Sequence, residues 1–143
     1  MRMWIYQMNQ KDWPPENFRC EIWEEQCLSW GYRKKMSAAM PAPGDTLVFF
    51  YASRDGKDLG IYGWAVIVRC SEKSQKIYFR PTTPTNHLKM DPWWDEAVQI
   101  ITKDVRGPMP RATLFPVQKK NVSKIRWGIQ KWLCSGAKRR PIS

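Results

Sequence analysis

The spacing of apolar residues along the chain predicts a succession of strands and helices. In residues 3–8, Trp4, Tyr6 and Met8 alternate with their neighbours, which is the period of a β-strand. The same alternation, bounded by turn residues, predicts further strands at residues 46–52, 61–70, 76–80 and 112–117. Apolar residues at helical spacing predict helices at residues 16–29, 92–105 and 121–133.

The predicted strand at residues 61–70 is apolar on both faces, so we expect it at the centre of a sheet or in a small closed barrel. Gly60 and Gly63 allow the strong curvature that a small barrel needs. Strands outnumber the helices that could connect parallel strands, which disfavours a doubly wound sheet. We therefore predict an α+β fold, a barrel of five or six mainly antiparallel strands with about three helices packed outside.

The length of 143 residues fits one domain, which we place at residues 1–136, with a basic tail at residues 137–143. The longest apolar runs are far shorter than the ~20 residues of a membrane helix. The first ten residues also lack the apolar stretch of a signal peptide. We expect a protein without a membrane segment.

The formal net charge is +11, and it is unevenly distributed. Residues 1–30 carry three basic and five acidic side chains, whereas residues 31–143 carry 21 basic and eight acidic ones. From Arg106 onward there are ten Lys or Arg and no Asp or Glu. Such an excess attracts polyanions, of which nucleic acid is the usual one. An acidic membrane surface, an acidic protein and plain solubility charge are the competing interpretations.

The four cysteines, Cys20, Cys27, Cys70 and Cys134, are scattered and form no CxxC pair. With His87 as the sole histidine, the sequence lacks the short-spaced ligand pairs of a structural zinc site. We expect reduced, mostly buried cysteines in a cytoplasmic protein, and neither a metal nor another cofactor.

The sequence offers little equipment for catalysis. One histidine allows at most one His-based acid–base site, and Asp91, four residues after it, is better explained as a helix cap. The phosphate-binding patterns GxxxxGKS and GxGxxG are absent, as is the signature of zinc-dependent deaminases. We therefore expect a binding module, and an enzyme of unrecognised type is the least favoured hypothesis.

Aromatic and basic side chains are interleaved most densely at residues 30–35, WGYRKK. Aromatic faces stack on nucleic-acid bases, and cations hold the flanking phosphates. The competing interpretation makes Trp30 the last core residue of the preceding helix and the following cations a solvated loop. Trp127 also has two interpretations: it borders the basic surface, or it packs against a second face.

Five segments, in order over most of the chain, resemble one known family. They are residues 3–6 (MWIY), 30–33 (WGYR), 43–51 (PGDTLVFFY), 61–67 (IYGWAVI) and 113–117 (TLFPV). They are similar to the Trp-bearing first strand, the W-G-x-R loop, the G-D-x-[VL]-x-F-Y strand, the strand after it and the late strand of the EVE domain. This domain belongs to the PUA-like superfamily and is related to the YTH readers of methylated RNA.

The resemblance implies a small pseudo-barrel that binds a modified base, flipped or single-stranded, in an aromatic pocket beside the barrel. It further implies that the end of the first strand and the loop after the first helix meet at one mouth of the barrel. The implied base pocket consists of Asn9, Gln10, Trp30, Gly31, Tyr32 and Arg33, with Trp93 as an opposite wall. This chain departs from the family pattern in two places, with Lys34 and Lys35 after the loop arginine and Asn9-Gln10-Lys11 after the first strand.

Each group in that pocket has an expected role. The rings stack on the base, Asn9 or Gln10 reads its edge, and Arg33 holds an exocyclic oxygen or the adjacent phosphate. Further phosphate contacts are expected from Lys34, Lys35, Arg106, Arg111, Lys119, Lys120 and Lys124. The expected partner is thus RNA or DNA. The alternative is a protein-interaction or regulatory module that docks its basic C-terminal helix on an acidic partner.

Overall fold

The computed structural model describes residues 2–9, 13–24, 28–33, 40–52, 58–84, 88–91, 96–105 and 113–135. These residues form six strands and three helices. The strands are β1 (Met3–Met8), β2 (Leu28–Gly31), β3 (Thr46–Tyr51), β4 (Gly60–Ser71), β5 (Lys76–Pro81) and β6 (Leu114–Pro116). The helices are α1 (Pro15–Glu24), α2 (Glu96–Val105) and α3 (Lys119–Ser135).

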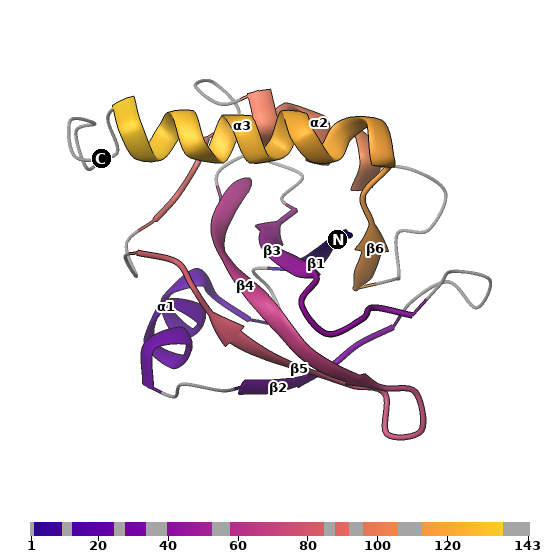
Figure 1. Cartoon of the computed structure of the whole chain (residues 1–143). Helices are drawn as coiled ribbons and strands as arrows, with labels where there is room; N and C mark the ends of the chain where they lie inside the picture. Colours follow the sequence, from indigo (N-terminus) through magenta and orange to yellow (C-terminus); the bar gives the residue numbers. More distant parts are fainter. Residues whose placement is uncertain are drawn as a thin grey trace.

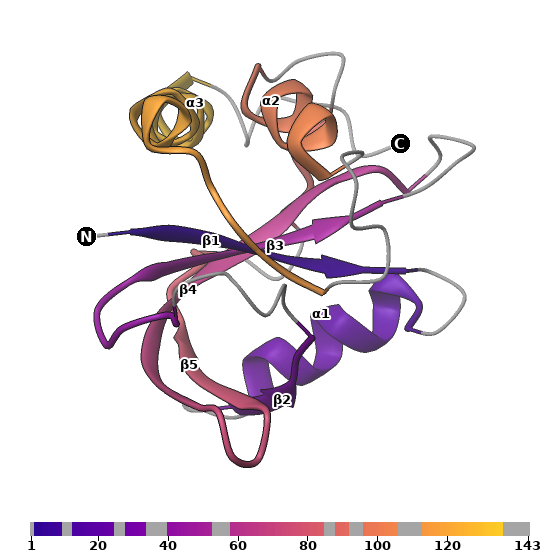
Figure 2. The same cartoon turned by 90° about the vertical axis from the view of Figure 1, so that its right-hand side faces the viewer.

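The six strands form one mixed sheet in the order β2-β5-β4-β3-β1-β6. β1 runs parallel to β3, with Met3 opposite Thr46, and all other neighbours are antiparallel. The sheet curls into a half-barrel, with α1 in its concave side and α2 and α3 across the opposite face (Figures 1 and 2). The predicted α+β fold, with mainly antiparallel strands and helices outside, is confirmed.

Alternating side chains supply two separate cores, one on each face of the sheet. In β1, Met3 and Ile5 pack with α2 and α3, whereas Trp4 and Met8 pack on the α1 side. β4 is buried on both faces from Gly60 to Tyr62, as its apolar pattern predicts, and becomes exposed at Val68 after its register with β5 shifts. Burial on both faces therefore extends along only part of β4.

α3 lies close against α2, and a glycine makes this approach possible. A Cβ built on Gly128 would come within 2.9 Å of the Ala97 Cβ, a spacing that real Cβ atoms do not adopt. On the same side of α3, Ile125 and Trp132 are buried in the core that α2 shares. The packing fixes which face of α3 points away from the protein.

A buried carboxylate ties the start of β3 to the start of β1. Asp45 follows Gly44, which adopts a φ of 90° in the turn before β3. The Asp45 carboxylate accepts hydrogen bonds from the backbone N–H of Arg2 (3.1 Å) and Ala42 (3.0 Å) and from the Trp4 indole N–H (3.1 Å). Burial favours a higher pKa for Asp45, but these donors outweigh it and the pKa lies below its ordinary value.

Two sequence-based predictions are wrong. The first helix ends at Glu24 instead of residue 29, and Leu28–Gly31 forms the strand β2, because these residues pair with β5 and alternate between buried and exposed.

The cysteines that the structure describes are not mostly buried: Cys20 and Cys134 are exposed and Cys70 is intermediate. Cys20 lies between the buried Phe18 and Ile22 on the outer side of α1. Cys27 lies outside the described residues.

Several other predictions also fall outside the described residues. They concern His87, the start of the second helix at residues 92–95 and the basic tail at residues 137–143. In the part of the chain that is described, no helix has both the length and the apolar character needed to cross a membrane.

Candidate functional site

Trp30 is half-buried in β2, at the centre of an aromatic cluster. Its ring contacts five others, with centroid distances of 4.8–6.0 Å: Tyr6, Trp13, Phe18, Phe49 and Phe79. The Trp30 indole N–H donates a hydrogen bond to the Glu21 carboxylate of α1 at 2.8 Å. The ring is therefore held in a fixed orientation, in a residue of intermediate exposure.

Tyr6, Gly31 and Arg33 extend this cluster toward the end of β2. The Tyr6 hydroxyl donates a hydrogen bond to the Gly31 carbonyl. Burial raises the pKa of Tyr6 to about 12, and the nearby Arg33 guanidinium offsets part of that rise. An exposed cation thus lies close to the aromatic cluster.

The segment after β2 is bound to β1 through the start of β6. The Arg33 N–H donates to the Thr113 hydroxyl at 2.7 Å, and the Arg33 carbonyl accepts from the N–H of Thr113 and of Leu114. The Thr113 carbonyl in turn accepts from the N–H of Gln7 at 2.7 Å. These bonds bring the loop after β2 and the end of β1 to one place in the fold.

Asn9 joins the same region through Trp13. Asn9 is exposed, and its carbonyl accepts a hydrogen bond from the N–H of Trp13 at 2.9 Å. The Trp13 ring lies 5.8 Å from the Trp30 ring. Of the implied pocket residues, Trp30, Gly31 and Arg33 lie at or just after the end of β2, and the Asn9 backbone is linked to Trp30 only through Trp13.

Tyr32 does not present a stacking face in this conformation. Its side chain is only 6% exposed, and its hydroxyl donates to the Ser71 carbonyl at 3.2 Å. Tyr32 follows Trp30 by two positions but points into the core, where it packs with Leu28 and Ile77. Its role is structural here, in contrast to the role that the resemblance implies.

The remaining predicted site residues divide into two groups. Gln10, Trp93, Lys34, Lys35, Arg106 and Arg111 lie outside the described residues. Lys119, Lys120 and Lys124 are exposed on α3. Because α3 covers the face of the sheet opposite α1, these three lysines lie away from the Trp30 cluster (Figure 2).

Three polar groups in the aromatic core are not apparent from the sequence. Among the described residues, the Trp13 indole N–H, the Arg19 Nε and the Tyr51 hydroxyl are buried without a hydrogen-bond partner. Trp13 contacts Trp30, while Tyr51 reaches the cluster through Phe18, at a centroid distance of 6.1 Å. A buried donor without a partner costs free energy unless a ligand or water satisfies it.

No signal in the sequence singles out these groups, because their isolation depends on tertiary packing. The cluster also lacks the means to hold a metal: in the described part of the chain, no three His, Cys, Asp or Glu side chains come together. What the cluster offers is a partly open indole, a cation and hydrogen-bond donors. This combination can bind a flat ring that carries acceptor atoms.

Comparison with known proteins places the chain by its fold. No family model matches it, and no curated protein sequence matches it. A solved structure of a hypothetical protein from Leishmania major is similar, with a TM-score of 0.57 and 12% identity over 92% of this chain and 96% of that one. The likeness is one of fold.

Two bacterial structures show the same fold. An NMR structure from Rhodopseudomonas palustris has a TM-score of 0.52 and 13% identity, and covers 91% of this chain and 94% of its own. A crystal structure from Pseudomonas putida has a TM-score of 0.50 and 13% identity, with coverage of 87% and 97%. The half-barrel with its helices is thus an arrangement that very different sequences adopt.

Proposed function

We propose that this chain is a non-catalytic nucleic-acid-binding module that holds a modified or flipped base against Trp30. The observation that carries the proposal is the partly exposed Trp30, whose indole is fixed by Glu21, together with the exposed Arg33 near the end of the same strand. A rigid aromatic face lowers the entropy cost of stacking on a base. The resemblance to EVE domains points to the same class of ligand.

The polar groups around Trp30 suit the edge and the backbone of a nucleotide. Arg33 can hold a phosphate or an exocyclic oxygen through charge-assisted hydrogen bonds. We place this function in the cytoplasm, because reducing compartments keep scattered cysteines in the thiol form.

The test compares Arg33→Ala with Arg80→Ala in binding to labelled single-stranded RNA and DNA at low salt. Both arginines are exposed, so both variants lose one charge at little expense to the fold. We expect Arg33→Ala to weaken binding about tenfold to hundredfold, since a hydrogen-bonded charge is lost, and Arg80→Ala to change affinity only slightly. Fluorescence anisotropy measures both.

Oligonucleotides that differ by one modified base provide the second arm of the test. We expect the modified base to be preferred at a single position, and the preference to disappear in Arg33→Ala if the arginine holds the base edge. The absence of measurable binding to any oligonucleotide at low salt contradicts the proposal. Equal losses in the two arginine variants would instead indicate general attraction of polyanions, as in a module that docks on an acidic partner.

A further inference from the structure

α3 exposes a large aromatic side chain that the fold does not use. Trp127 is 59% exposed, the most of any large apolar side chain in the described part of the chain. The helix already supplies its packing face through Ile125 and Trp132 on its other side. An indole that stays in water adds no buried apolar surface to the fold. Trp127 is therefore a candidate contact for a partner.

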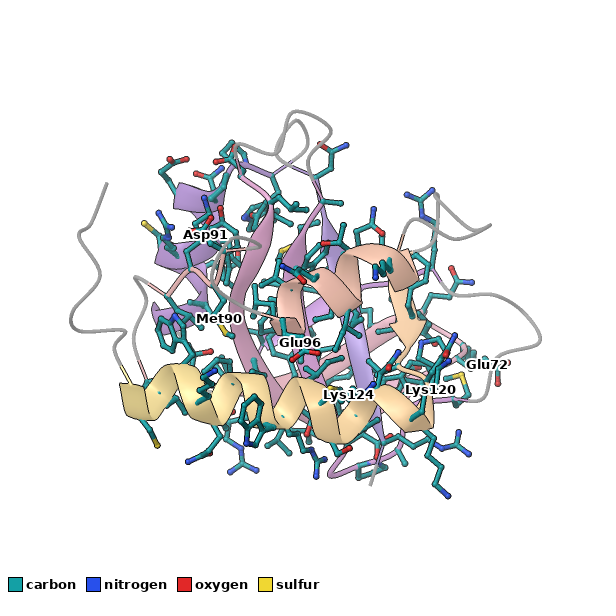
Figure 3. All side chains as sticks on the ribbon, turned by 90° about the horizontal axis from the view of Figure 1, so that it is seen from above. Glu72, Met90, Asp91, Glu96, Lys120 and Lys124 are labelled. Atoms are coloured by element: carbon teal, nitrogen blue, oxygen red, sulfur yellow. The ribbon has the colours of Figure 1, made fainter. Side chains whose placement is uncertain are left out.

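Trp127 lies in a stripe of lysines along one side of α3. Lys120, Lys124, Trp127 and Lys131 follow one another at spacings of four, three and four residues, which places them on one face of a helix. We call these four residues the α3 stripe. All four are exposed, and at 1.5 Å per residue the stripe is about 16 Å long. Figure 3 shows Lys120 and Lys124 on the first half of α3.

The charge of α3 has one sign. Residues 119–135 include five Lys or Arg and no Asp or Glu. The Lys131 ammonium lies 5.0 Å from the centroid of the Trp127 ring, so a cation sits next to the aromatic face. Glu96, the first residue of α2, lies beside α3 (Figure 3), next to the Ala97 that contacts Gly128. The Glu96 carboxylate therefore borders the cationic surface of α3.

We propose that the α3 stripe binds single-stranded nucleic acid, with Trp127 stacked on an exposed base and Lys120 and Lys124 neutralising phosphates on the N-terminal side of the ring. A single strand fits better than a duplex, because only unpaired bases offer a free face for stacking. The length of the stripe matches a few nucleotides, given an axial spacing of about 3.4 Å per nucleotide in a duplex strand and more in an extended one.

Other partners fit the stripe less well. A membrane-surface helix needs a continuous apolar face toward the lipid, whereas the apolar face of α3 is buried against the sheet and α2. Leu133, the other large exposed apolar side chain of α3, lies six residues from Trp127 and hence on a different side of the helix. One flat ring among cations is the arrangement used for bases and phosphates.

The inference rests on the proposed function, to which it adds a second contact on the opposite face of the sheet. Trp30 packs on the α1 side and α3 covers the other side, so one strand reaches both only by passing around the edge of the half-barrel. Two separate contacts predict that variants of Arg33 and of Trp127 lower affinity independently, because distant sites contribute additively.

The experiment measures binding of a fluorescent single-stranded oligonucleotide and of its duplex to variants of the full chain, over a range of salt concentrations. We expect Trp127→Ala to weaken single-strand binding about fivefold to hundredfold without altering the slope of log affinity against log salt. Leu133→Ala is the matched control on the same helix and is expected to bind as the wild type does. The duplex is expected to respond weakly to Trp127→Ala.

The charge arm compares two double variants that lose the same charge. Lys120→Gln with Lys124→Gln is expected to flatten the single-strand salt slope by about 1.4, because each neutralised phosphate contributes about 0.7. Arg69→Gln with Arg80→Gln, at exposed positions of β4 and β5, is expected to leave the slope unchanged. Glu96→Gln is expected to raise affinity, most strongly at low salt, because it removes the bordering carboxylate.

Unchanged single-strand affinity of Trp127→Ala would overturn the inference, as would equal effects of the two double variants on the salt slope. Binding of polyglutamate at the stripe with the same affinity as the oligonucleotide would overturn it too, and would assign the surface to acidic proteins. If Arg33→Ala weakens binding while Trp127→Ala does not, the proposed function stands and the α3 contact fails. The reverse result supports the α3 contact and counts against the Trp30 pocket.

Discussion

Replacing Asp45 by alanine is expected to lower the free energy of unfolding by about 3 kcal/mol or more. The substitution leaves the Trp4 indole N–H and the backbone N–H groups of Arg2 and Ala42 without their acceptor. The Trp4 indole N–H is buried, so losing its acceptor costs about 1–3 kcal/mol, and the partly buried N–H groups of Arg2 and Ala42 each add less. Urea unfolding of the wild type and the variant measures the difference, and an effect below about 1 kcal/mol would contradict this account.

The matched variant Asp45→Asn tests the charge separately. The pKa of Asp45 is lower in the folded chain than its ordinary value of 3.8. The carboxylate therefore contributes its stabilisation above about pH 4, and this contribution is lost as the pH falls through the folded-state pKa. We expect Asp45→Asn to lose stability at pH 7 and to show a smaller further loss than the wild type between pH 4 and pH 2.

Replacing Trp30 by alanine is expected to destabilise the protein by about 3–5 kcal/mol. The Trp30 ring packs against five other rings, so its removal opens a cavity in the α1-side core. The substitution also removes the hydrogen bond that the indole N–H donates to the Glu21 carboxylate. Thermal and urea unfolding measure the change. A variant as stable as the wild type would show that Trp30 contributes little to packing.

Trp127→Ala is the control for this prediction. It removes the same side chain from a position that is 59% exposed, and we expect a change of no more than about 0.5 kcal/mol. The contrast also decides how binding is tested. Loss of oligonucleotide binding in Trp30→Ala would be confounded with unfolding, whereas Arg33→Ala leaves the aromatic core intact.

Long periodic segments were predicted well from the sequence, and short ones were not. The strand Met3–Met8 was predicted with the correct ends, and the other long strands were predicted to within about one residue, because alternation over six residues is distinctive. β2 has only four residues and begins four positions after the end of α1, so its short alternation fits a continued helical pattern as well. Only pairing with β5 makes Leu28–Gly31 a strand.

The positions of some candidate residues in the fold could be predicted. The interleaved aromatic and basic residues at 30–35 single out Trp30 and Arg33. The resemblance implies that they lie near the end of the first strand. The roles of Tyr32 and Trp13 were not accessible in this way. Tyr32 lies in the same motif as Trp30 yet points into the core, while Trp13 approaches Trp30 from a loop.

What the sequence determined by itself is the fold class, the basic charge of the C-terminal part and the amphipathic character of α3, since these depend on local periodicity and on residue counts. The tertiary structure decided which aromatic side chains are exposed to solvent. Trp30 is half-buried because β2 pairs with β5 beneath α1, and Trp127 is exposed because the contact of Gly128 with Ala97 turns it outward. Exposure depends on contacts between residues far apart in the chain, which local patterns do not contain.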